Sequence, residues 1–140
     1  MTTALAGSHV AGLISEALTD SVVNWNDTDV WIRPERLQDV AALLKDNGDL
    51  DFAFLASISA VDYVEYFEIV YHLTSLRHNH QLTLKTRIYG REGPSLPSVV
   101  AIWQGADLQE REIWDLMGVR FDGHPNMKRI LLWEEFPGHP

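Results

Sequence analysis

The first third of the chain carries apolar residues at helical spacing. They recur every three or four positions over residues 3–18 and again over residues 37–44, which predicts two helices. Pro34 precedes the second stripe, where a helix start tolerates proline, and Asn47 with Gly48 follows it as a C-terminal cap.

From residue 52 the period shortens to two, which is typical of strands with one buried face. Tight turns near Glu65 and near His78 and Asn79 separate the alternating segments, so an antiparallel meander is expected. Phe52, Phe54 and the alternate residues that follow are expected to share one face. The three strands are predicted at residues 52–60, 67–73 and 82–88, and two shorter strands at residues 20–26 and 30–32.

The last third contains one further helix. Asp107 as N-cap and Glu110 three residues later form a capping-box pattern, and Gly118 marks the end. Residues 90–97 are rich in glycine, proline and serine and are expected to form a loop, followed by a short helix at 98–103.

These elements predict an α+β fold in a single domain covering residues 1–140. The order is helix, strand, strand and helix, then a three-stranded antiparallel meander, then a C-terminal helix with an irregular tail. Residues 1–90 form the sheet part, and residues 91–140 form the helix and a docking tail. A length of 140 residues suits one core.

Composition narrows the class of protein. Residues 1–70 hold twelve acidic and three basic side chains, a balance of −9, whereas residues 71–140 hold eight of each. An acidic half of this kind disfavours nucleic acids and anionic lipid as partners. The chain has no cysteine, which excludes disulfides and thiolate-bound zinc or iron–sulfur clusters. It has neither an apolar run of about 18 residues nor a basic leader, so a cytoplasmic protein is expected.

Two histidines raise the possibility of a metal site. His78 and His80 are two positions apart, and on a strand they point to the same side, where imidazoles bind zinc or nickel. Glu68 is a candidate third ligand. Polar turn histidines are commoner than metal ligands, so a small stand-alone metal-dependent enzyme is the alternative hypothesis.

The helix after residue 106 gathers three carboxylates in six residues, Glu110, Glu112 and Asp115. Glu112 and Asp115 share a helix face, and Asp107, Arg111 and Asp115 follow one another at i,i+4 spacing. Spacing alone favours a ladder of ion pairs over acid–base chemistry.

The run from residue 110 to residue 132 closely resembles the signature of the 30 kDa-type (C-type) subunit of proton-pumping NADH:quinone oxidoreductase, respiratory complex I. The E-R-E triplet, the acidic residue three positions later, the Gly-His-Pro sequence and the basic-aliphatic ending have the family's spacing. The matching residues are Glu110, Arg111, Glu112, Asp115, Gly118, Gly123, His124, Pro125, Lys128 and Arg129.

The resemblance implies a non-catalytic assembly subunit of the hydrophilic arm, which supports electron transfer from NADH to quinone coupled to proton translocation. No active site or cofactor is expected in this chain, because flavin mononucleotide, iron–sulfur clusters and quinone bind to other subunits. The resemblance also implies that the signature residues dock against the large 49 kDa-type (D-type) quinone-site subunit, on the cytoplasmic side of the inner membrane. Equivalent subunits of energy-converting hydrogenases and of ferredoxin- or F420-linked dehydrogenases stay open as alternatives.

Overall fold

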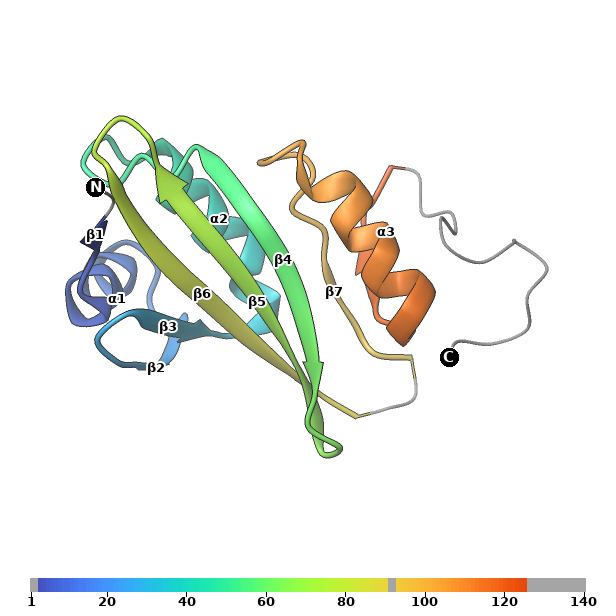
Figure 1. Ribbon diagram of the computed structural model, residues 1–140. Helices are drawn as coiled ribbons and strands as arrows, with labels where there is room; N and C mark the ends of the chain where they lie inside the picture. Colours follow the sequence, from blue (N-terminus) through green and yellow to red (C-terminus); the bar gives the residue numbers. More distant parts are fainter. Residues whose placement is uncertain (1–2, 91–92, 126–140) are drawn as a thin grey trace.

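A mixed sheet forms the centre of the structure, a computed structural model that describes residues 3–90 and 93–125 (Figure 1). The strand order is β2-β3-β6-β5-β4, and β1 pairs with the start of β6. β3 and β1 run parallel to β6, and the other pairs are antiparallel. The strands are β1 (Thr3–Ala4), β2 (Val22–Trp25), β3 (Asp29–Ile32), β4 (Phe54–Asp62), β5 (Tyr66–Ser75) and β6 (His80–Tyr89).

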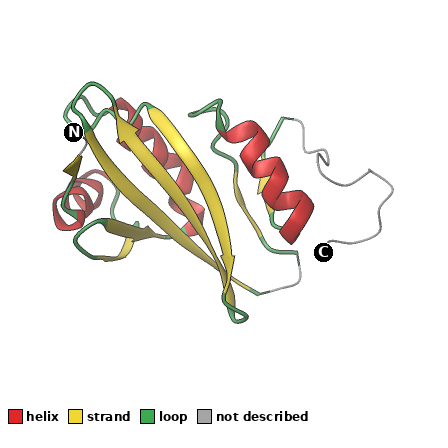
Figure 2. Ribbon diagram, in the orientation of Figure 1, coloured by secondary structure: helices red, strands yellow, loops and turns green. Residues whose placement is uncertain are grey.

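Three α-helices accompany the sheet in the described ranges (Figure 2). α2 lies against one face of the sheet, and α3 lies beside β4 at the sheet's edge (Figure 1). None of these helices has the length and hydropathy that crossing a bilayer requires. The remaining elements are α1 (Gly7–Ala17), the 3₁₀ turn η1 (Pro34–Arg36), α2 (Leu37–Asp46), β7 (Ser95–Pro97), α3 (Ala106–Met117) and β8 (Arg120–Asp122). This order confirms the predicted α+β class.

The N-terminal segment departs from the predicted helix over residues 3–18. Thr3 and Ala4 instead extend the sheet as a strand parallel to β6, and the Leu5 amide donates to the Gln81 carbonyl at 3.0 Å. The helix begins only at Gly7, whose amide donates to the Asp27 carbonyl at 3.1 Å. Sheet pairing therefore overrides the helical spacing over the first four residues of the predicted helix.

The end of α2 is set by an asparagine side chain. Asn47 has φ −67°, outside the left-handed region, and its Oδ1 accepts from the amides of Asp49 (2.9 Å) and Leu50 (3.2 Å). The helix ends where the sequence predicts. The expected glycine cap at Gly48 is replaced by this side-chain turn.

A bulge breaks the alternation predicted for β4. The pairing register shifts between Leu55 and Ser57, so the two ends of the strand are out of phase. Leu55 and Ile58 are buried, whereas Phe54 is 49% exposed. The expectation that Phe52, Phe54 and the alternate residues after them share one face is wrong, because an extra residue in one strand reverses the direction of the side chains.

The segment before α3 also differs from expectation. Residues 95–97 form β7, which pairs in parallel with β8, although a loop is predicted there. Residues 98–103 form a single turn, closed by the Trp103 amide on the Val99 carbonyl at 2.8 Å, where a short helix is expected. Residues 95–97 form a strand rather than a loop because the backbone of β8 pairs with them.

One buried cluster joins both parts of the chain. Leu37, Val40 and Leu44 of α2 belong to the same cluster as Ile69 and Leu73 of β5. The C-terminal third contributes to the same core through Leu96, Val99, Trp103, Ile113 and Phe121.

Two glycines in α1 provide a test of this packing. A Cβ on Gly7 would lie 2.7 Å from the Asp29 carbonyl oxygen and still closer to that of Asn26, whereas one on Gly12 would meet nothing within 4 Å. We expect Gly7→Ala to lower the free energy of unfolding by about 2–3 kcal/mol, because the clash is with backbone. Gly12→Ala should raise it by up to about 1 kcal/mol through helix propensity. Urea denaturation of both variants checks this, and equal effects would contradict the close packing at Gly7.

Candidate functional site

The signature helix α3 is fastened to the edge strand β4 by an amide side chain. Gln109 Oε1 accepts from the Ile58 backbone amide at 2.6 Å, and its Nε2 donates to the Gly105 carbonyl at 3.1 Å. Open strand edges invite pairing with other chains. Gln109 therefore positions α3 and covers part of this edge.

Glu110 lies fully inside the protein. Its carboxylate accepts from Ser98 Oγ at 2.6 Å and from the Val99 amide at 2.9 Å. Burial raises the pKa of Glu110, and the hydrogen bonds from Ser98 and Val99 oppose that rise. The predicted capping box is wrong, because Gly105 is the N-cap without a side-chain cap and Glu110 binds the segment after β7 instead.

His124 folds the segment after β8 back onto the start of α3. Its Nε2 lies 3.2 Å from the Asp107 carbonyl and 3.0 Å from Asp107 Oδ1, and its side chain is fully buried. The contact with the carbonyl has hydrogen-bond geometry, whereas Asp107 Oδ1 has no hydrogen-bond partner among the described residues. Both partners are acceptors, so Nε2 carries the proton. Gly118 (φ 76°) and Gly123 (φ 84°) supply the left-handed backbone at the two bends of this return.

Two further polar side chains are buried, one on α3 and one on β5. Asp115 and Tyr71 are both 0% exposed, and within the described residues the Tyr71 hydroxyl has no hydrogen-bond partner. Burial raises the pKa of Tyr71 well above its ordinary value, and the charge of Glu110 raises it further. Two carboxylates of α3, Glu110 and Asp115, are therefore buried inside the protein.

The outer face of α3 has a different character. Leu108 is 57% exposed and Leu116 41%, and the exposed Glu112 lies between them at i,i+4 spacing. Arg120 stacks over the Trp114 ring, 5.6 Å from its centroid. A cavity of about 270 Å³ beside this pair extends along residues 120–124.

The structure therefore places the signature residues in different environments. Glu110 and Asp115 face inward, whereas Glu112 faces solvent and Arg111 is half-buried. The C-cap of α3 is Gly118, and the return segment after β8 contains Gly123, His124 and Pro125. Two further signature residues, Lys128 and Arg129, lie outside the described residues.

The histidine pair proposed as a metal site does come together. The rings of His78 and His80 stack with centroids 5.5 Å apart. Their Nε2 atoms lie 2.7 Å from the Gly48 carbonyl and 2.6 Å from the Leu50 carbonyl. Residues 3–90 and 93–125 contain no cluster of three side chains able to hold a metal. These contacts fasten the α2–β4 loop to the β5–β6 turn.

A sequence model of the family described as "Respiratory-chain NADH dehydrogenase, 30 Kd subunit" matches residues 30–140. The chain belongs to this family. Its membership confirms the resemblance drawn from the signature run, and with it the main functional prediction of a subunit of an NADH:quinone oxidoreductase.

Individual relatives agree with this assignment to the 30 kDa-subunit family. The C-type subunit of the NADH-quinone oxidoreductase of Roseiflexus castenholzii is 40% identical over 144 residues, covering 98% of this chain and 82% of the relative. Its counterpart in Salinispora tropica is 40% identical over 129 residues, covering 89% of this chain and 52% of the relative. A chain of the "membrane-bound sulfane sulfur reductase (MBS), an archaeal respiratory membrane complex" has a TM-score of 0.70 at 24% identity, covering 89% of this chain and 75% of that one. That last likeness shows the fold.

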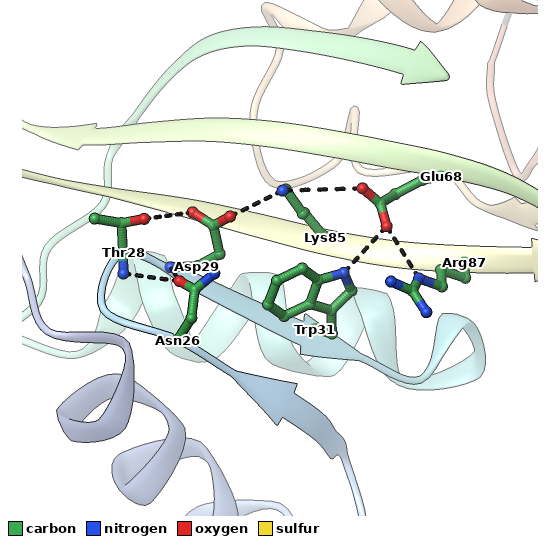
Figure 3. Close-up of polar contacts among 7 residues, drawn as sticks. All are labelled: Asn26, Thr28, Asp29, Trp31, Glu68, Lys85 and Arg87. Atoms are coloured by element: carbon green, nitrogen blue, oxygen red, sulfur yellow. Dashed lines mark hydrogen bonds and ion pairs between the residues drawn. The ribbon is translucent and has the colours of Figure 1, made fainter. Parts of the chain in front are cut away.

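The open face of the sheet carries a polar network that the sequence pattern does not predict (Figure 3). Glu68 Oε2 accepts from Trp31 Nε1 at 3.1 Å and from Arg87 Nε at 3.0 Å. Lys85 Nζ lies 2.8 Å from Asp29 Oδ2 and 3.9 Å from Glu68 Oε1. The alternation of β5 and β6 places Glu68, Lys85 and Arg87 on one face, but the parallel pairing of β3 that brings in Trp31 leaves no local signal.

Two pKa values reflect this network. The hydrogen bond to Glu68 raises the pKa of Arg87. Burial would raise the pKa of Asp29, but hydrogen bonds from Lys85 and Thr28 outweigh it, so the pKa is lowered. Both shifts favour the ionised forms of Arg87 and Asp29.

The buried carboxylate of Glu110 predicts a pH dependence. Because its pKa is raised in the folded chain, the protonated form stabilises the fold, and this contribution is lost as pH rises above the ordinary value of 4.5 and through the folded pKa. Glu110→Gln removes this titration. Its free energy of unfolding should therefore improve relative to the wild type between pH 4.5 and neutral pH, measured by urea denaturation. Glu112→Gln, on the exposed face of the same helix, is the control, and parallel pH curves for the two variants would contradict the assignment.

Proposed function

We propose that this chain is a structural subunit of the hydrophilic arm of an NADH:quinone oxidoreductase, without an active site of its own. The observation that carries the proposal is that signature residues form hydrogen bonds within the protein. Glu110 binds Ser98 and Val99, and His124 binds Asp107, so these groups hold α3 in place. Groups committed to hydrogen bonds inside the protein act in support of the fold rather than on a substrate.

The docking surface of this proposal is the outer face of α3 together with the segment through residue 129. Its described part exposes Leu108 and Leu116 beside the Trp114–Arg120 pair. Aromatic and arginine side chains beside exposed aliphatic ones are typical of protein interfaces. We infer that this face packs against the large 49 kDa-type quinone-site subunit.

The redox groups in this proposal belong to other subunits. The sequence contains no cysteine to ligate an iron–sulfur cluster. The clusters are therefore assigned to the partners, and flavin mononucleotide and quinone are assigned to them as the family resemblance implies. The chain is peripheral and sits on the cytoplasmic side of the membrane through the rest of the complex.

The docking surface is tested by burying a charge in it. We expect Leu108→Asp and Leu116→Asp each to reduce the fraction of chain recovered in the assembled complex by about tenfold, because a desolvated carboxylate at the contact costs at least about 1.4 kcal/mol. The fraction is measured on blue-native gels.

Leu76→Asp is the matched control, because Leu76 is 77% exposed on the β5–β6 turn, remote from α3 (Figure 1). It should leave assembly unchanged. An equal loss in all three variants would contradict the docking surface. Fully assembled complex with a selective loss of quinone reduction would contradict the structural role itself.

A further inference from the structure

A groove opens where β3 leaves the sheet and β6 continues. β3 pairs with β6 only as far as Ile32 opposite Thr86, and the chain then turns away into η1. Over the described residues, no strand pairs with Arg87, Ile88 or Tyr89 on the side away from β5. The space there measures about 610 Å³. The last three residues of β6 are thus a short open edge inside the sheet.

The groove has an apolar interior. Ile32 and Ile88 line it and are buried, at 2% and 7% exposure. Val23 and Tyr89 line it as well and are 60% and 67% exposed. Apolar groups of a partner could pack against these side chains. An aliphatic side chain fits the chemistry of this lining.

The charged side chains that line the groove favour the binding of an anionic group. Arg33 and Arg87 line the groove, against the single carboxylate of Glu35. Asp20 binds the Arg33 guanidinium at 3.2 Å, and neither this carboxylate nor that of Glu68 lines the groove. The Arg87 guanidinium is bound by Glu68 at 3.0 Å and shares a side-chain hydrogen bond with Tyr89. The two arginine side chains are still 45% and 41% exposed. A guanidinium has five donors, so both retain capacity for a further carboxylate.

Arg87 is held in position before any partner arrives. Glu68, whose side chain is only 6% exposed, fixes the Arg87 Nε (Figure 3). The guanidinium also lies 4.8 Å from the centre of the Tyr66 ring and 5.9 Å from that of the Trp31 ring. A side chain ordered in advance loses little entropy when it binds. The network of Figure 3 therefore gives this groove a fixed anion-binding group.

We propose that the groove binds an extended, acidic segment of a neighbouring subunit. The segment lies along Arg87, Ile88 and Tyr89 as an added strand, which is a common mode of peptide recognition at open sheet edges. An aliphatic side chain enters between Val23 and Ile32, and a carboxylate binds the arginines. The inference rests on the proposed function for the existence of neighbouring subunits, and it assigns them a second contact separate from the outer face of α3.

Crosslinking in the assembled complex tests the groove directly. A photoreactive amino acid replaces Val23 in the full chain, the complex is irradiated, and the attached peptide is identified by mass spectrometry. We expect one segment of another subunit, with Asp or Glu next to an aliphatic residue. The same amino acid at Leu76, 77% exposed on a distant turn, should not capture that segment.

Charge reversal tests the anion. Arg33→Glu should reduce the yield of the Val23 crosslink by about tenfold, the change expected from losing one charge-assisted contact. Arg77→Glu makes the same substitution at an exposed residue of the β5–β6 turn and should leave the yield unchanged.

The outcomes separate the two proposals. A wild-type chain that fails to enter any complex overturns the proposed function. A chain that enters the complex but gives no Val23 crosslink overturns the groove. Capture of a segment without acidic residues, capture of a second copy of this chain, or a yield that Arg33→Glu leaves unchanged also overturns the groove.

Discussion

The C-terminal third of this protein depends on one buried carboxylate. Glu110 has lost its contact with water, and two donors from a single turn, Ser98 Oγ and the Val99 amide, replace it. A buried charge without such partners would cost several kcal/mol, so α3 and this turn are stable only together. This turn follows β7, which pairs with β8. It also brings Trp103 into the core, where Trp103 Nε1 donates to the Phe52 carbonyl at 2.9 Å. One satisfied carboxylate thus ties the signature helix, the loop before it and the sheet into a single unit.

This arrangement changes the meaning of the family signature. The signature contains an inner set that builds the platform, Glu110 and Asp115 together with the return through His124. It also contains an outer set that is available to partners, of which Glu112 is the clearest member. The exposed leucines that accompany Glu112 lie outside the E-R-E triplet. The signature of this subunit therefore includes residues that stabilise its own core as well as residues that are exposed to partners.

The open face of the sheet also carries a buried carboxylate that the fold positions, but there the positioned charges remain partly exposed. Glu68 is buried and is bound by Trp31, Lys85 and Arg87, and the Arg87 side chain is still 41% exposed. A group that is positioned by the fold and still has unused donors is suited to recognition. In α3, by contrast, the polar groups of the inner face are turned into the protein.

The sequence by itself determined the class and the order of the elements, because the periods of three to four and of two reflect which residues are buried along each segment. It also determined the family, through residues 110–132. The tertiary structure alone decided where β1 and β7 form, how the bulge redirects Phe54 and which signature carboxylates face inward. It also brought Ser98 to Glu110, Gln109 to Ile58 and Trp31 to Glu68. These contacts join residues 12 to 51 positions apart, so their partners are set by packing and strand pairing, which no local pattern records.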